Sequence, residues 1–309
     1  MVCDINTGVC GEVGNESLEI IDFNQPQQKV DLYYFTDPIC SHCWALEPVL
    51  RRFEEEYGQY FKLRTVMGGL LKNWDGFADV KNGIRSPSDV ADHWREVGEH
   101  SRMPIDGSLW RNNPIQSSYP ASRVFKVIQR EDEAAARTFL RRAREAVFAF
   151  NRNIGDNHVL VDLVNQMGLD GAAVVKEAEG QDGVAWLEQD FALAGSLGAR
   201  GFPTIMMINE EKKGVKIVGA RQLESYVDAL KQALPNETIQ PRQIPGLQQM
   251  LRREGLLFSK EIEVLYDVQA DAVETYIHKE LSADAFTAHE LLGEYYIENL
   301  NQPLNEMNR

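Results

Sequence analysis

The stretch Tyr33-Tyr34-Phe35-Thr36-Asp37-Pro38-Ile39-Cys40-Ser41-His42-Cys43-Trp44 decides how the rest of the chain is interpreted. It predicts an apolar strand, a short turn and the start of a helix. Two cysteines, two residues apart, fall at the helix start. There the first backbone N–H groups lack helical partners and the helix dipole favours a thiolate. The stretch therefore predicts dithiol–disulfide chemistry, with Cys40 as the nucleophile and Cys43 as the resolving thiol.

Three neighbours of the cysteines are candidate site residues. His42 lies between them, and we expect it to lower the pKa of Cys40 through a hydrogen bond or a positive charge. A lower pKa would make Cys40 a better leaving group and would stabilise the reduced form. We expect Trp44 to pack beside the site, where it can contact a substrate. Asp37 precedes the helix, where it can cap the helix or tune the site.

The pattern around this stretch predicts an α/β protein. Strands at 30–35 and 61–67 flank a helix at 40–57, which is the arrangement of a parallel βαβ unit. From about 71 to 193 the periodicity is helical. A β-hairpin is expected at 204–218 and an amphipathic helix at 222–234. Three prolines, Pro235, Pro241 and Pro245, then mark a linker or strap before about 60 residues with a helical pattern.

Composition excludes several classes of partner. The 309 residues carry a formal charge of −15, whereas nucleic acids and anionic membranes attract basic proteins. No apolar run approaches the roughly 18 residues of a membrane span. The N-terminus lacks the basic and apolar regions of a signal peptide, so we expect a cytoplasmic protein. In a reducing compartment a Cys-x-x-Cys pair is more often catalytic, redox-sensing or metal-binding than structural.

Two motifs together resemble the DsbA-like thiol–disulfide oxidoreductases, and most closely their FrnE-like branch of dithiol–disulfide isomerases. The first is Phe35-Thr36-Asp37-Pro38 followed by the two cysteines. The second is Gly201-Phe202-Pro203-Thr204 before a strand. The resemblance implies a thioredoxin fold in which a cis-proline, Pro203, faces the cysteines. It also implies that Phe202, Pro203 and Thr204 contact a protein or small-molecule thiol or disulfide substrate.

The sequence pattern, together with this resemblance over about residues 30–234, predicts the following organisation. An N-terminal tail with a candidate edge strand covers 1–29. The thioredoxin fold is formed by 30–70 and 199–234, interrupted by a large all-helical insertion at 71–198. A C-terminal helical extension covers 246–309.

The chain is also similar to the YjbH (SpxH) adaptors, which deliver the regulator Spx to the ClpXP protease. The similar features are Asp37-Pro38, Trp44, Glu47-Pro48 and the tail around Ile262–Tyr266. From Gly246 onward the chain has 12 Asp or Glu and 5 Lys or Arg, so its extension is acidic. The intact dithiol favours redox catalysis, whereas the extension favours an adaptor with a protein partner. Both functions stay open at this point.

Cys3 and Cys10 are the remaining cysteines. They can act as auxiliary thiols that exchange electrons with Cys40 and Cys43, complete a four-cysteine zinc site, or remain free thiols in a tail. Their separation is looser than the usual spacing of zinc ligands, which weakens the zinc hypothesis. We therefore expect no cofactor and no metal beyond a redox-active Cys40–Cys43 disulfide.

Overall fold

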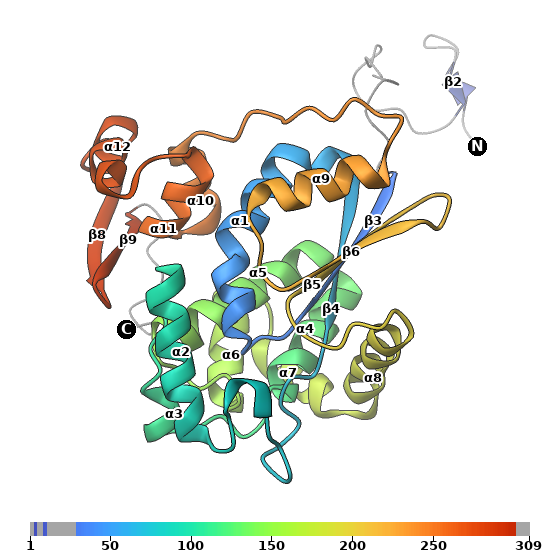
Figure 1. Cartoon of the computed structure of the whole chain (residues 1–309), viewed down its shortest axis with the longest axis vertical. Helices are drawn as coiled ribbons and strands as arrows, with labels where there is room; N and C mark the ends of the chain where they lie inside the picture. The colour runs from blue at the N-terminus through green and yellow to red at the C-terminus, as the bar shows by residue number, and fades with distance from the viewer. Residues whose placement is uncertain (1–2, 5–8, 11–28, 301–309) are drawn as a thin grey trace.

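The computed structural model describes residues 29–300 and the two short strands β1 (Cys3–Asp4) and β2 (Val9–Cys10). The strand expected within 1–29 at about residues 18–23 lies outside the described residues. Figure 1 shows the elements along the chain.

The thioredoxin fold is built on a four-stranded sheet with the order β4-β3-β5-β6. Its strands are β3 (Val30–Thr36), β4 (Phe61–Met67), β5 (Thr204–Asn209) and β6 (Gly214–Val218). Strands β3 and β4 are parallel, and β5 and β6 form an antiparallel hairpin. The expected βαβ unit is therefore present, and its helix starts where β3 ends.

Helices cover both faces of this sheet. Helix α1 (Ser41–Tyr57) and helix α9 (Leu223–Ala233) lie side by side on one face (Figure 1). They bury Leu50, Phe53 and Tyr226 against apolar side chains of the sheet. On the other face Phe35 and Met206 pack against helix α8 (Gln181–Ser196). Side chains of β3 are buried on both faces of the sheet, which explains why most of its residues are apolar or aromatic.

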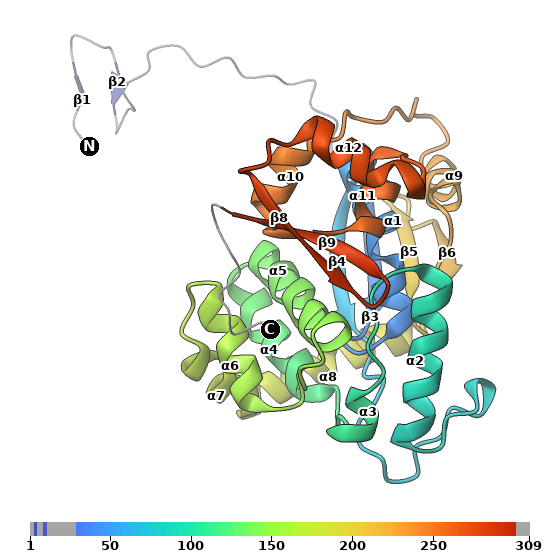
Figure 2. The ribbon, with the colours of Figure 1, turned by 90° about the vertical axis from the view of Figure 1, so that its left-hand side faces the viewer.

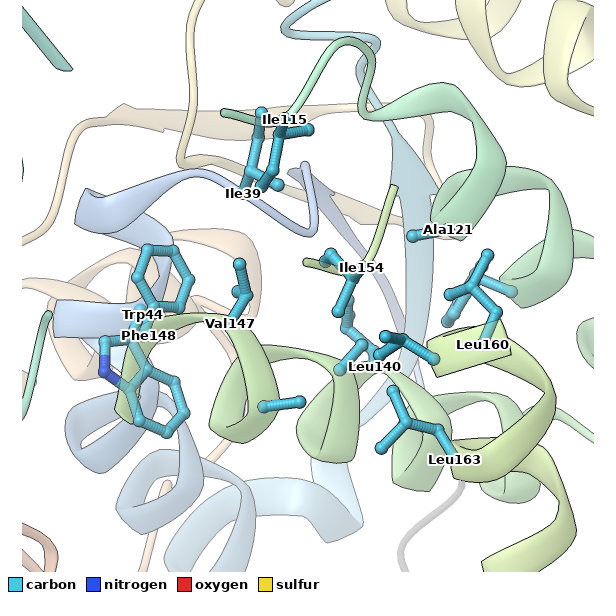
Figure 3. Close-up of a cluster of buried hydrophobic side chains, with 14 of the residues drawn as sticks. Ile39, Trp44, Ile115, Ala121, Leu140, Val147, Phe148, Ile154, Leu160 and Leu163 are labelled. Atoms are coloured by element: carbon cyan, nitrogen blue, oxygen red, sulfur yellow. The ribbon is translucent and has the colours of Figure 1, made fainter. Parts of the chain in front are cut away.

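The insertion between β4 and β5 is helical, as predicted. Its other helices are η2 (Val80–Asn82), α2 (Pro87–Ser101), α3 (Leu109–Asn112), α4 (Tyr119–Glu131), α5 (Glu133–Arg144), the π-helical turn η3 (Glu145–Ala149), α6 (Asn157–Gln166) and α7 (Gly171–Glu179). Its core includes Leu140, Leu160 and Leu163, and it reaches Trp44 of α1 (Figure 3). One continuous apolar core thus joins the insertion to the dithiol helix.

The C-terminal extension is helical only in part, which corrects the prediction for 246–309. Helices α10 (Leu247–Glu254), α11 (Ser259–Tyr266), η4 (Ala270–Ala272) and α12 (Val273–Glu280) are present. Strands β7 (Leu256–Phe258), β8 (Phe286–Leu291) and β9 (Glu294–Asn299) form an antiparallel sheet with the order β7-β9-β8. We call residues 246–300 the C-terminal module. It has its own apolar core around Met250, Leu257, Ile262 and Ile297.

A proline-rich strap, residues 235–246, joins α9 to the C-terminal module. It runs across the end of α1, where the short helix η1 (Gly58–Tyr60) follows. The Arg242 amide donates to the carbonyl of Glu56 at 2.7 Å, and the Gln240 amide donates to the Tyr60 hydroxyl at 3.0 Å. The strap is thus bonded to the body along its length. Figure 2 shows the module that follows it, lying over α1 and α5.

Within the described residues, no helix is both long and apolar enough to cross a membrane.

Candidate functional site

The two cysteines of the site lie at the start of α1. Cys40 is the residue that precedes the first helical turn, and the Trp44 amide donates to its carbonyl at 3.1 Å. Both cysteines are free thiols. Cys40 is 5% exposed and Cys43 is fully buried. The backbone therefore places the dithiol as predicted, but only Cys40 reaches the surface.

The loop before β5 completes the site. The peptide bond between Phe202 and Pro203 is cis, and the Cys40 sulfur lies 3.6 Å from the Phe202 carbonyl oxygen. The Phe202 ring lies directly against Gly68, where a Cβ atom would come within 1.9 Å of it. Glycine at position 68 is thus required for this close approach. The fold brings together residues more than 160 positions apart in the sequence.

The ionisation of the two thiols is coupled. The hydrogen bond with Cys43, together with burial, raises the pKa of Cys40 well above its ordinary value. Burial opposes the ionisation of Cys43 as well. The hydrogen bond from Cys40 and the charge of Arg144 outweigh it and lower the pKa of Cys43. When one of the two thiols loses its proton, the negative charge is therefore on Cys43. Cys43 is the less accessible of the two sulfurs.

The surroundings of His42 disfavour its charged form, and an effect on Cys40 through a hydrogen bond stays a prediction. Its ring packs against that of His93 with the centroids 5.3 Å apart. Partial desolvation and the neighbouring His93 lower the pKa of His42, so it is neutral at pH 7. The expected positive charge beside Cys40 is therefore absent at neutral pH.

Two residues predicted to contact a substrate are occupied elsewhere. Trp44 is fully buried, donates its indole N–H to the carbonyl of Pro104 at 2.9 Å and stacks on Phe148. The Thr204 side chain is buried, and its hydroxyl donates to the Gly201 carbonyl at 2.7 Å. Packing and internal hydrogen bonds hold these two side chains inside, so substrate contact by Trp44 and Thr204 stays a prediction. Phe202 is partly exposed at the site.

The buried carboxylate of Asp37 joins neighbouring segments through hydrogen bonds and does not cap the helix. Its carboxylate accepts hydrogen bonds from the amides of Ile39 at 3.1 Å and Leu70 at 2.8 Å, and from the Ser118 hydroxyl at 2.8 Å. Burial raises its pKa, although these donors favour the ionised form. Asp37 thus ties the turn before Cys40 to the loop after β4 and to helix α4.

Sequence reasoning missed a buried arginine behind the dithiol. Arg144 of α5 is fully buried, pairs with Glu47 of α1 and donates to the Thr36 hydroxyl. Its guanidinium also lies 5.9 Å from the centre of the Tyr34 ring. It supplies the positive charge that favours a Cys43 thiolate. The Arg141-Arg142-Ala143-Arg144 run was the available signal, but such a run is usually a solvated helix face.

Arg141 was missed for the same reason. It is 5% exposed, and two of its nitrogens donate to Glu261 of α11 at 2.5 and 2.7 Å. The guanidinium lies 5.0 Å from the centre of the Trp44 ring and 5.5 Å from that of Phe258. A charged contact therefore connects the helix of the dithiol, the insertion and the C-terminal module.

A cleft of about 670 Å³ opens beside Cys40. It lies between the start of α1, the loop that follows β4, and helices α2 and α3. Its walls are mostly apolar and aromatic, and include Trp74, Trp110 and Phe202. His42, His93 and Arg200 also line it. The cleft has the size and the apolar character of a ligand site.

Among the residues whose side chains are described, no group of three or more His, Cys, Asp or Glu is arranged to hold a metal ion. The backbones of Cys3 and Cys10 pair across β1 and β2. Their proposed roles as auxiliary thiols or zinc ligands stay predictions.

The sheet, the dithiol at the start of α1 and the facing cis-proline loop define a thioredoxin-fold protein. A family model described as thioredoxin matches residues 33–228. The cytosolic disulfide reductase DsbM from Pseudomonas aeruginosa is similar in structure, with a TM-score of 0.54 and 22% identity. The match covers 67% of this chain and 100% of DsbM. At this identity the likeness shows the fold.

The whole chain is similar to proteins named ClpXP adapter protein SpxH. The one from Halalkalibacterium halodurans is 30% identical over 283 residues, which cover 90% of each chain. The one from Bacillus subtilis is 29% identical over 258 residues, covering 82% of this chain and 84% of the relative. The chain therefore belongs to the thioredoxin family and, within it, to the family of the SpxH proteins.

Proposed function

We propose that this protein is an adapter that binds a client protein and presents it to the ClpXP protease, with the regulator Spx as the client. The observation that carries the proposal is the buried contact of Arg141 of α5 with Glu261 of α11, which fixes the C-terminal module to the helical insertion beside the dithiol helix. A disulfide reductase of this fold is complete without such a module, since DsbM is matched over its whole length by 67% of this chain.

The similarity to SpxH proteins supports the same function. A match over 90% of the chain has to include part of the C-terminal module, which the likeness to DsbM does not require. The module is also more acidic per residue than the rest of the chain. An acidic surface held rigidly on the body suits recognition of a protein partner.

The ionisation of the dithiol also favours an adapter over an enzyme with rapid turnover. The thiolate is the nucleophile in disulfide exchange, and burial with the Cys43 hydrogen bond raises the pKa of Cys40. At pH 7 only a small fraction of Cys40 would then be reactive.

The test is degradation of purified Spx by reconstituted ClpXP, with and without the full chain. We expect the wild-type chain to accelerate degradation at least ~10-fold. Cys40→Ser should retain this effect within ~2-fold, because the adapter does not need sulfur chemistry. No acceleration by the wild-type chain, or its loss in Cys40→Ser, would contradict the proposal.

Thiol–disulfide exchange is the second candidate function, favoured by the proximity of Cys40 to the cis-proline loop. In this reaction the Cys40 thiolate attacks a substrate disulfide and forms a mixed disulfide. Cys43 then attacks Cys40, which releases the reduced substrate and leaves a Cys40–Cys43 disulfide. Turnover of a disulfide substrate that depends on both cysteines would establish this function.

We propose that the protein is cytoplasmic. A Cys-x-x-Cys pair with a redox role is typical of a reducing compartment, and the structurally similar DsbM is a cytosolic reductase.

A further inference from the structure

Strand β6 forms an open edge of the four-stranded sheet. Within the described residues it pairs with β5 alone. The opposite edge, strand β4, is occupied by side chains of the helical insertion: Gln129 donates to the Thr65 carbonyl at 3.0 Å, and the Met67 amide donates to Asp190 at 2.8 Å. The β5–β6 hairpin instead extends beyond the helices that cover the sheet (Figure 1). β6 is therefore the edge at which a further strand can be added.

The hairpin register shows which backbone groups of β6 point outward. At the end of the hairpin the Gly219 amide donates to the Pro203 carbonyl at 2.8 Å. Because the direction of the hydrogen bonds alternates along an antiparallel pair, Val215 and Ile217 also bond toward β5. The amides and carbonyls of the alternate residues therefore point away from the sheet, and these residues are Gly214, Lys216 and Val218.

The side chains of β6 differ between the two faces of the strand. Val215 and Ile217 are partly buried against the core between the sheet and α9. On the other face Lys216 is exposed and Val218 is 52% exposed. Side chains on an added strand would continue both faces, so that apolar groups would lie beside Val215 and Ile217 and polar groups beside Lys216.

The charge of this edge is opposite to that of the whole protein. Residues 212–221 contain four Lys or Arg and no Asp or Glu, on a chain with a formal charge of −15. Lys216 donates to the Gly198 carbonyl, and its ammonium group has two further N–H groups. Lys213 pairs with Glu211 at 2.8 Å, and both side chains are largely exposed. The edge is thus a local attraction for carboxylates.

The lysines exclude a second copy of this chain as the added strand. Antiparallel pairing of β6 with itself over its full length sets Lys216 directly opposite the same residue of the other copy. Like charges that lie directly opposite each other destabilise a strand pair. Lysine on an edge strand is a common means of preventing such self-association. The same lysine attracts a strand that carries carboxylates, so the edge is selective for an acidic partner.

We propose that the outer edge of β6 binds an extended acidic segment of another protein, which adds to the sheet as an antiparallel fifth strand. Its backbone pairs with the outward amides and carbonyls of Gly214, Lys216 and Val218. Its carboxylates lie on the face of Lys216, and its β-branched apolar side chains lie beside Val215 and Ile217. β6 does not line the cleft beside Cys40 and is separate from the C-terminal module, so the inference does not depend on the adapter function.

The probe is a fluorescein-labelled peptide, Gly-Glu-Val-Glu-Ile-Glu-Gly, and binding to the full chain is followed by fluorescence anisotropy. We expect Lys216→Glu to weaken binding at least ~10-fold, whereas Lys176→Glu, the same change at an exposed lysine of α7, should stay within ~2-fold of wild type. Val218→Pro removes an outward amide and no bond to β5, and it should weaken binding at least ~5-fold. No binding by the wild-type chain, or equal binding by wild type and Lys216→Glu, would overturn the inference.

Two methylated peptides separate strand addition from charge attraction. Methylation of the backbone nitrogens of two glutamates removes donors that face β6, whereas methylation of those of valine and isoleucine changes only the outer edge of the new strand. Both peptides keep the same charge and the same number of methyl groups. We expect the first to bind at least ~10-fold more weakly than the second. Equal binding of the two peptides would show that charge alone holds them and would overturn the inference.

The backbone signals of β6 give a residue-specific readout of the same binding. In a 15N–1H spectrum we expect the amide signals of Gly214, Lys216 and Val218 to move downfield with the peptide, because these amides gain acceptors. The signals of Val215 and Ile217 should move less, since their amides already bond to β5. Equal shifts along the strand, or shifts confined to other parts of the chain, would overturn the assignment of this edge.

Discussion

The contact between Arg141 and Glu261 predicts that one buried charge stabilises the docked C-terminal module. In Glu261→Gln the side-chain volume is kept and the charge is removed. Arg141 is then left with Glu145, to which its Nε donates at 2.7 Å, as its remaining buried partner. Breaking a buried ion pair by removing one partner costs about 3–5 kcal/mol. Because Glu145 remains, we expect a loss near the lower limit, about 3 kcal/mol.

The assay is urea denaturation followed by tryptophan fluorescence, which is suitable because Trp44 stacks under Arg141. A loss of about 3 kcal/mol corresponds to a fall in Tm of about 6–12 °C for a chain of this order of size. Glu274→Gln changes an exposed carboxylate of the same module and should stay within about 0.5 kcal/mol of wild type. A loss below about 1 kcal/mol in Glu261→Gln would refute the reasoning.

A double variant separates the cost of an unpaired charge from the value of the pair. Replacement of both members of a buried pair by apolar residues is often neutral or stabilising. We therefore expect Arg141→Met with Glu261→Leu to lose less stability than Glu261→Gln alone. A larger loss in the double variant would show that the pair itself, not the stranded charge, carries the energy.

Three further predictions concern acid, the site loop and the thiols. The arginines around Glu254 outweigh its desolvation by burial and lower its pKa to about 2, so the stability that it contributes is complete above pH 4.5 and lost as the pH falls toward 2. Between pH 5 and pH 2 the wild type should therefore lose about 3 kcal/mol more than Glu254→Gln in denaturation experiments, and an equal loss in the two proteins would contradict this. Gly68→Ala should destabilise the protein by about 1–3 kcal/mol in urea, because the new methyl group overlaps the Phe202 ring, and a change below about 0.5 kcal/mol would argue against the close contact. The alkylation rate of Cys40 should rise only above its ordinary pKa and change less than ~2-fold in His42→Asn, whereas a rate already maximal at pH 7 would show an activated thiolate.

The thioredoxin part of the fold could be predicted because its signals are local. The apolar strand 30–35, the cysteines at a helix start and the Gly201–Thr204 motif each have a short sequence signature. The parallel pairing of β3 and β4 and the hairpin of β5 and β6 follow from the order of these elements. The prediction of an interrupted thioredoxin fold is confirmed.

The sheet of the C-terminal module was missed because its turn is unusual. Strands β8 and β9 are joined by Leu292 and Gly293, which both have positive φ, 51° and 81°. Such two-residue turns normally carry Asn-Gly or Asp-Gly, because leucine is strained in this conformation. Without that signal, the alternation in the two strands is easily read as part of a helix.

The charged residues behind the site could not be predicted at all. Glu47, Arg141 and Arg144 are spaced along helices in a way that is typical of solvated faces. Only the packing of the insertion and of the C-terminal module on α1 removes them from water. Whether a charged side chain is buried depends on the tertiary structure, so the spacing of charged residues in the sequence does not predict it.

The bonded strap has a consequence for how tightly a client can be held. A flexible linker as long as residues 235–246 would have a root-mean-square end-to-end distance of about 20 Å. The C-terminal module would then change its position relative to the thioredoxin fold. Here the hydrogen bonds to Glu56 and Tyr60 keep the cleft and the module at one fixed separation. A client that binds both the cleft and the module loses its translational and rotational freedom only once. Two weak contacts therefore give a much higher overall affinity than either contact alone. The same rigidity means that a client whose two binding segments do not match this separation gains nothing from the second surface.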